Sequence, residues 1–366
     1  MSNLLDKNIS SKTEQKNLNI QILRAIAIIM VVLQHYKIRM PTEGWYLSIF
    51  KYVQFWPGVD IFLAISGYLM CKSLLKESQN NERFIIIFKR FIVKRMFRLY
   101  PVLLLWGILT ILICFFSADR FFTNAMSELK TFLASMAAVS NFYLYHCVKN
   151  GYLCSNASGG VTWSLSLEWQ LYVVLALLVI PLVNRQRFLI TIFLLICIGS
   201  IFIPAAEPQN QAYAWWIRPI PFFLGATTFF IEKRIVKFNM NLAILLCTLS
   251  FIALITAPVY SKTQYVSLSI GLAGGLIFYI FVYSIKFNEN ILVKLLNWIG
   301  DRSYSIYLCH IPSMIAVATL LEYLSKITNH QISNIWFMMA YIILMLTLAH
   351  VTYKYVELYF ISKNKK

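Results

Sequence analysis

Charged residues are scarce in this chain of 366 residues: they make up 13% of it, and only 15 are acidic. A soluble protein carries roughly 25% charge, because its surface must be compatible with water. The shortage, with 59% hydrophobic residues and a mean hydropathy of +0.66, predicts a polytopic membrane protein. No polar stretch is long enough for a soluble Rossmann, barrel or nucleic-acid-binding domain, so we expect no nucleic acid as a partner.

The sequence also lacks a Gly-rich phosphate loop and the Cys and His spacing of a zinc site, so we expect no bound metal. It has seven cysteines. Cys147 and Cys154 flank a short loop that we expect on the outer side, where the compartment is oxidising. The sequence does not decide whether these two cysteines form a disulfide or remain free thiols. The other five lie in or beside hydrophobic segments: Cys71, Cys114, Cys197, Cys247 and Cys309.

Hydrophobic segments of membrane-crossing length recur along the chain. At about 20 apolar residues per crossing, the sequence predicts an all-α membrane helix bundle of ten spans. Residues 1–19 form a polar cytoplasmic tail, residues 20–357 the membrane domain and residues 358–366 a basic cytoplasmic tail. The predicted spans are 20–36, 52–74, 99–117, 163–183, 188–205, 215–232, 239–257, 265–285, 298–322 and 334–356.

The distribution of basic residues fixes the predicted orientation. Lys and Arg outnumber the acids by 33 to 15. With Lys72 and Lys354 counted on the side where their spans end, 22 of them lie on one side, 8 on the other and 3 within spans. Basic loops stay in the cytoplasm, so both termini are predicted to be cytoplasmic. Segment 127–146 is amphiphilic, and a full crossing there would destroy the asymmetry. We therefore expect it to be a re-entrant or outer-surface element.

Ionisable residues inside spans are informative, because each costs roughly 2.5–3.5 kcal/mol to insert and needs a partner. Arg24 and His35 are eleven residues apart, which places them on one face of a helix and about 16 Å apart along its axis. A snorkelling arginine and an interfacial histidine are the alternative. Asp60 in the second span is expected to compensate Arg24 or to orient His35, or else to form a structural ion pair.

Three further patterns place polar groups in or beside the membrane. Ser164, Glu168 and Tyr172 follow at i, i+4 and i+8 and form one stripe, either at a site or in a structural network between helices. The run 300–312 is densely polar, and its histidine is either functional or simply satisfied within the bundle. The basic stretch 72–98 is predicted to include a helix lying in the inner interface; it suits a polyphosphate ligand, or it only sets the topology.

Taken in order, these motifs resemble the acyltransferase-3 family of bacterial inner-membrane proteins, which move acyl groups, usually acetyl, onto surface carbohydrates. The resemblance covers about residues 20–357. Two positions depart from the family pattern: Trp169 stands where a second acid is common, and Leu358-Tyr359 where a proline is frequent. The matching elements are Arg24 with His35, Gly58 to Gly67, Arg95 to Pro101, Trp163 to Tyr172, Arg218 with Phe222, Gly225 and Ala226, Gly300 to Pro312, and Val356-Glu357.

The resemblance implies an O-acyltransferase of the inner membrane, with acyl-CoA (acetyl-CoA in the usual case) as co-substrate and no bound cofactor. Its acceptor would be a cell-surface or lipid-linked carbohydrate such as O-antigen, capsule or exopolysaccharide, and its other partners membrane lipids. Some relatives carry a soluble domain after the membrane part and none follows residue 357, so we expect the membrane domain to act alone or to hand the group to a partner.

Individual roles follow from the same resemblance. His35 would be the general base or a transient acyl carrier, Arg24 would stabilise charge on the thioester oxygen, and Asp60 or Glu168 would orient the imidazole. A flippase or transporter of lipid-linked saccharide, and a different membrane acyltransferase with a lipid acceptor, are the rival functions. The residues expected to bind coenzyme A or substrate are Arg95, Arg98, Trp163, Ser164, Tyr172, Arg218, Tyr304, Tyr307 and His310.

Overall fold

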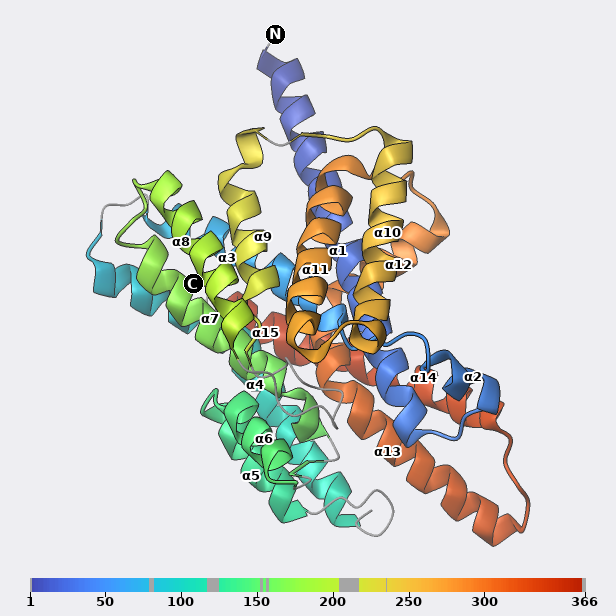
Figure 1. Cartoon of the computed structure of the whole chain (residues 1–366). Helices are drawn as coiled ribbons and strands as arrows, with labels where there is room; N and C mark the ends of the chain where they lie inside the picture. Colours follow the sequence, from blue (N-terminus) through green and yellow to red (C-terminus); the bar gives the residue numbers. More distant parts are fainter. Residues whose placement is uncertain are drawn as a thin grey trace.

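The computed structural model is a bundle of helices around the long first helix (Figure 1). It describes residues 2–78, 82–116, 125–151, 154–155, 158–203, 217–234 and 236–363, and all regular structure within these ranges is helical. The predicted all-α membrane bundle is therefore confirmed.

The first half of the chain forms helices α1 (Ser2–Arg39), α2 (Gly44–Ile49), α3 (Gly58–Ser78), α4 (Phe84–Phe116), α5 (Ala125–Met136), α6 (Ser140–Lys149) and α7 (Trp163–Val179). The second half forms α8 (Gln186–Gly199), α9 (Pro219–Phe230), α10 (Met240–Tyr260), α11 (Thr263–Ser284), α12 (Ile291–Asp301), α13 (Ser303–Thr328), α14 (Asn334–Thr352) and α15 (Leu358–Lys363). Short 3₁₀ turns precede α7 and follow α8 and α9, and a π-turn (Tyr353–Glu357) joins α14 to α15.

Eight helices in the described ranges are long and apolar enough to cross a membrane. They correspond to eight of the ten predicted spans. The other two predicted spans, 188–205 and 215–232, hold the shorter apolar helices Gln186–Phe202 and Pro219–Phe230. Residues 204–216, which include the facing ends of these two spans, lie outside the described residues.

The predicted interfacial helix before residue 99 is wrong as a separate element. Residues 84–116 form the single helix α4, which runs through Pro101. Its 33 residues extend about 50 Å, well beyond the roughly 30 Å of a hydrocarbon core. A proline is tolerated inside a membrane helix because neighbouring groups satisfy the freed carbonyl. Arg95 and Arg98 are thus held on the same helix that crosses the membrane.

Three other boundaries differ from the sequence prediction. The span predicted at 298–322 is broken at Arg302, where α12 ends and α13 begins. The helix α1 continues back through the predicted polar tail to Ser2, and residues 358–363 continue the last span as α15. In each case the helix ends where its packing or its continuation into the next segment sets the boundary. A hydropathy pattern contains no information about either.

Segment 127–146 is divided into α5 and α6 by a turn at Ala138, whose φ is 56°. Neither helix has the length of a crossing, as predicted. Both lie at the end of the bundle opposite the N-terminus (Figure 1). Cys147 at the end of α6 forms a disulfide with Cys154, with 5.9 Å between their Cα atoms, which answers the question that the sequence left open.

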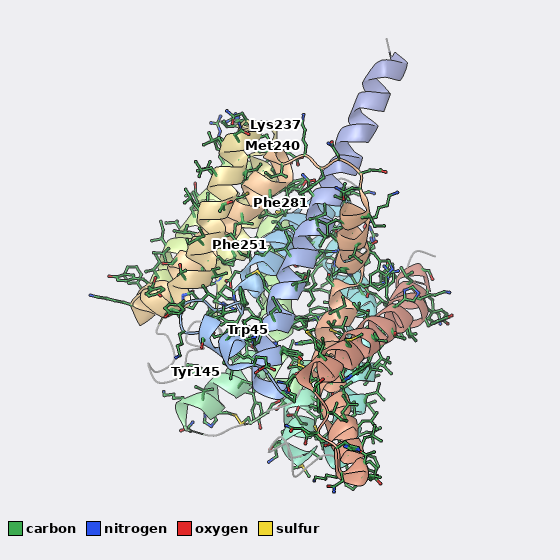
Figure 2. All side chains as sticks on the ribbon, turned by 90° about the vertical axis from the view of Figure 1, so that its right-hand side faces the viewer. Trp45, Tyr145, Lys237, Met240, Phe251 and Phe281 are labelled. Carbon is green, nitrogen blue, oxygen red and sulfur yellow. A yellow bond between two sulfur atoms is a disulfide. The ribbon has the colours of Figure 1, made fainter. Side chains whose placement is uncertain are left out.

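The two ends of the bundle differ in character (Figure 2). Lys237 and Met240 lie at one end, Trp45 and Tyr145 toward the other, and Phe251 and Phe281 between them. The first end carries the basic loop before α10, and the second carries the disulfide.

Small residues allow α3 and α9 to pack with their backbones in contact. A Cβ at Gly67 would overlap the carbonyl of Phe222, and a Cβ at Gly225 would overlap the carbonyl of Ala64. Such close approach is typical of helix pairs in membranes, where small residues replace the hydrophobic driving force. The contact fixes α3 in place, and α3 also packs against α1, α7 and α11.

We predict that Gly67→Ala lowers the melting temperature of the detergent-solubilised protein, because the added methyl group collides with backbone that cannot move alone; overpacking of this kind costs about 1–3 kcal/mol. Gly199→Ala is the matched control, since a Cβ at that helical glycine meets nothing within 4 Å. Thermal unfolding curves of the two variants and the parent protein measure the difference. Equal melting temperatures for Gly67→Ala and the parent would contradict the close packing.

Candidate functional site

A cavity of about 90 Å³ lies between α1, α3, α4, α7 and α13. Its wall combines guanidinium groups, carboxylates, hydroxyls and a set of apolar side chains. Eight of the thirteen residues predicted for the site line it: Arg24, Arg95, Arg98, Ser164, Glu168, Tyr172, Tyr304 and Tyr307. The remaining lining residues are Val59, Phe62, Leu63, Ser66, Leu69, Met70, Leu99, Leu165, Asp301, Ser303 and Glu357.

Three arginines on two helices face this cavity. Arg24 comes from α1, and its guanidinium contacts Gln21 Oε1 at 3.4 Å; Arg95 comes from α4 and donates to Ser73 Oγ at 2.9 Å. The Nε–H of Arg95 is buried and has no hydrogen-bond partner. Among the described residues, none of the three arginines forms an ion pair with a carboxylate. The cavity therefore has unused cationic donors that an anion would satisfy.

Three carboxylates balance these cations across the cavity. Glu168 accepts hydrogen bonds from the hydroxyls of Ser66 and Tyr172, and Glu357 accepts one from Ser305 Oγ at 3.0 Å. Asp301 precedes the membrane-spanning part of α13, and burial raises the pKa of its carboxyl, against the opposing effect of Arg302 and Arg24. The predicted stripe of Ser164, Glu168 and Tyr172 does face one cavity.

The hydroxyls of Ser164 and Tyr307 form a hydrogen-bonded pair in the wall of the cavity. Their oxygens are 2.7 Å apart, and the Tyr307 hydroxyl lies 2.6 Å from the Val161 carbonyl. A carbonyl only accepts, so the single phenolic proton goes to Val161, and Ser164 donates to Tyr307. Because α13 begins at Ser303 beside the arginines, Tyr307 stands about 6 Å further along the helix axis.

His35 and His310 lie further along α1 and α13 than the residues of these helices that line the cavity. His310 is fully buried, its Nε2 lies 3.0 Å from His35 Nδ1, and its Nδ1 lies 2.7 Å from the Tyr307 carbonyl. The described residues that line the cavity include neither histidine. His35 contacts α13, and Arg24 lines the cavity together with residues of α13, in agreement with the shared face that their spacing predicts; only Arg24 lines the cavity.

Asp60 forms the structural ion pair that the sequence left open as an alternative. Its Oδ2 accepts from Arg218 Nη1 at 2.9 Å, and both side chains are fully buried. The other expectation, that Asp60 compensates Arg24 or orients His35, is wrong. The Arg218 guanidinium lies over the rings of Trp56 and Trp163, at 5.0 and 4.7 Å. These residues do not line the cavity, so the described structure uses them to join α3, α7 and α9.

Four further polar residues line the cavity that are not among the predicted site residues: Ser66, Asp301, Ser303 and Glu357. Each lies in a motif or polar run of the sequence, but no pattern marks it as a cavity residue. The helix break at Arg302 and the π-turn bring Asp301, Ser303 and Glu357 to the cavity. π-Turns are rare overall, but those that occur are often found at functional sites. No sequence pattern predicts them, so only the structure reveals this signal.

Comparison with known sequences shows a family match over most of the chain. A family described as an acyltransferase domain matches residues 17–354. A peptidoglycan O-acetyltransferase of Listeria monocytogenes is 26% identical over 92% of this chain and 54% of its own length. A putative peptidoglycan O-acetyltransferase of Bacillus subtilis is 24% identical over 92% and 53%.

A putative membrane-bound transacylase of Komagataeibacter xylinus is 26% identical over 82% of this chain and 73% of its own length. The chain spans about half the length of the two peptidoglycan O-acetyltransferases. No solved structure matches it significantly.

We predict that Asp60 and Arg218 are energetically coupled. Asp60→Asn leaves the Arg218 guanidinium buried without a counter-ion, and breaking such a pair costs about 3–5 kcal/mol. Arg218→Gln leaves the Asp60 carboxylate buried without a counter-ion in the same way. The double variant removes both charges, so its loss of stability should be smaller than the sum of the two single losses. Thermal unfolding of the four proteins in detergent measures this; simple additivity would show that the pair is not coupled.

Proposed function

Because the chain belongs to the acyltransferase-3 family and is a multi-pass membrane acyltransferase, we propose that it is an O-acyltransferase, in particular an O-acetyltransferase, that uses acyl-CoA from the cytoplasm. The acceptor is a hydroxyl group of a carbohydrate outside the membrane. One observation carries the proposal: three arginines line a cavity, and His35 and His310, in contact with each other, lie further along two of the helices that form it.

The proposed setting is the inner membrane, with both termini in the cytoplasm. The basic residues at the Lys237 end of the bundle support this orientation. The disulfide between Cys147 and Cys154 at the other end also supports it, since disulfides persist on the oxidising side of a membrane.

The donor would enter the cavity from the cytoplasmic side. Arg95 and Arg98 would hold the phosphates of coenzyme A, because guanidinium groups bind phosphate oxygens with paired, charge-assisted hydrogen bonds. The apolar wall formed by Phe62, Leu63 and Leu69 suits the pantetheine arm and a short acyl chain. Arg24 would then lie near the thioester and stabilise the negative charge that develops on its oxygen.

The reaction itself would occur on the Tyr307 side of the cavity. The acceptor hydroxyl attacks the thioester carbonyl, His35 removes the hydroxyl proton, and the coenzyme A sulfur leaves and takes up a proton. For this a path must open between the cavity and His35, because the described lining of the cavity does not include His35. Rotation of the Tyr307 side chain would open it; this breaks its hydrogen bonds to Ser164 and to the Val161 carbonyl, while its backbone keeps its place in α13.

The acceptor class is the least constrained element of the proposal. Two of the relatives are named as peptidoglycan O-acetyltransferases, one of them putatively, so a glycan of the cell envelope, such as O-antigen, capsule or exopolysaccharide, is the natural candidate. Mass spectrometry of surface glycans from cells with and without the gene would identify the acetylated sugar.

We predict that Arg98→Ala raises the KM for acetyl-CoA. Loss of one charge-assisted hydrogen bond of about 1.5–3 kcal/mol corresponds to roughly a 10- to 100-fold increase. Lys89→Ala is the control, because Lys89 lies on the same helix and carries the same charge but is exposed and does not line the cavity. The rate at which each purified variant releases coenzyme A thiol, measured at increasing acetyl-CoA concentrations, gives its KM. An equal KM in the two variants would contradict the phosphate-binding role.

We predict that His35→Ala lowers the turnover of acetyl-CoA in the presence of acceptor by roughly 10²- to 10⁴-fold, the contribution of a general base. The amount of protein in the membrane should stay normal, as immunoblotting would show. Full activity in this variant would refute the catalytic role. Purified protein that moves saccharide across vesicles without consuming acetyl-CoA would instead support the flippase alternative.

A further inference from the structure

The contact between His35 and His310 joins the two helices that also form the cavity. His35 lies near the end of α1, and His310 lies on α13, one turn after Tyr307. Their ring centroids are 5.1 Å apart, and the nearest ring nitrogens, His35 Nδ1 and His310 Nε2, are 3.0 Å apart. The second nitrogen of His310 is held at 2.7 Å from the Tyr307 carbonyl.

The positions of the protons follow from the identity of these atoms. The Tyr307 carbonyl only accepts, so His310 Nδ1 must carry a proton and donate it. In neutral His310 the other nitrogen, Nε2, is then an acceptor. His35 Nδ1 must therefore carry a proton and donate it to His310 Nε2. This leaves His35 Nε2 without a proton and with a free lone pair.

The neutral state of His310 is the one its surroundings favour. The side chain is fully buried, and its hydrogen-bond partners in the described structure are a carbonyl and another imidazole. The charged residue acting on it is Arg39, a cation, which disfavours a second positive charge nearby. A buried imidazolium without a carboxylate would be costly.

We propose that His310 is a positioning residue that fixes His35 in its Nδ1–H tautomer and so presents Nε2 as the base. The inference rests on the proposed function for the identity of the reaction, although the tautomer itself does not. His310 would act through His35 and would not contact the substrate, because it is fully buried and the described lining of the cavity does not include it. This replaces the substrate-binding role expected from the sequence.

The proton balance of the transfer fits this arrangement. As the acceptor oxygen forms its bond to the acyl carbon, the hydroxyl proton moves to His35 Nε2. His35 keeps its Nδ1 proton and donates it more strongly to His310, which changes neither charge nor tautomer. When the carbon–sulfur bond breaks, the proton on Nε2 passes to the departing thiolate, and both rings return to their starting state. In effect His310 would take the place that an aspartate holds in a catalytic triad, but without a charge.

The tautomer can be observed directly. The chain has only five histidines, so uniform labelling of histidine with ¹⁵N gives few ring signals. We expect solid-state NMR of the full-length protein in lipid to show His35 with a protonated Nδ1 and an unprotonated Nε2, and His310 with the same tautomer. His35→Asn and His310→Gln assign the signals by removing one residue each. A proton on Nε2 of His35 in the parent protein would overturn the proposal.

Kinetics then test whether this tautomer matters. His310→Leu removes the hydrogen-bond acceptor of His35. We expect kcat to fall roughly 10- to 100-fold, the effect of removing residues that orient a metal-binding histidine. The KM for acetyl-CoA should stay within about twofold of the parent value, because the cavity is unchanged. His310→Gln keeps an acceptor oxygen near the former Nε2 and should recover part of kcat. Ser313→Ala, which alters a buried hydroxyl one turn further along α13, is the control and should retain the parent kcat.

The outcomes separate the inference from the proposed function. If His310→Leu raises KM as much as it lowers kcat, or if Gln rescues no better than Leu, His310 is not a positioning residue. If the parent protein consumes no acetyl-CoA at all, the proposed function fails. The NMR result would still decide the tautomer in that case.

Discussion

The cost of holding charge away from water governs the arrangement of this bundle. Asp60 and Arg218 are fully buried and tolerable only because each neutralises the other at 2.9 Å. Arg24, Arg95 and Arg98 form no direct ion pair among the described residues and lie instead around a cavity that they share with Glu168, Asp301 and Glu357. The same physical rule therefore separates a structural ion pair from a set of cations available for binding.

Tyr307 connects the two parts of the candidate site. Its hydroxyl, held by Val161 and Ser164, lines the cavity, while its carbonyl anchors His310 and through it His35. These two contacts depend on different atoms, so the side chain can move without releasing the histidines. The cavity and the proposed base are thus connected through one residue of α13, although the described lining of the cavity does not include His35.

Backbone contact between α3 and α9 gives this site a firm support. Gly67 and Gly225 let the helices approach so closely that any side chain there would meet backbone. Ser66 and Asp60 belong to the same helix, α3, and face the cavity and Arg218 respectively. The sequence does not indicate which helix supplies the other backbone, because small residues occur in several spans.

The sequence by itself determined the membrane class, the all-α fold and which residues share a face within an unbroken stretch of helix. The shared face of Ser164, Glu168 and Tyr172 follows from covalent helix geometry, which needs no neighbour. Only tertiary structure decided the relations between helices: Asp60 pairs with a residue 158 positions away, and His35 with one 275 positions away. The hydrocarbon environment requires that such groups find partners, but it does not say which. That choice depends on how the helices pack, and packing is a property of the whole bundle.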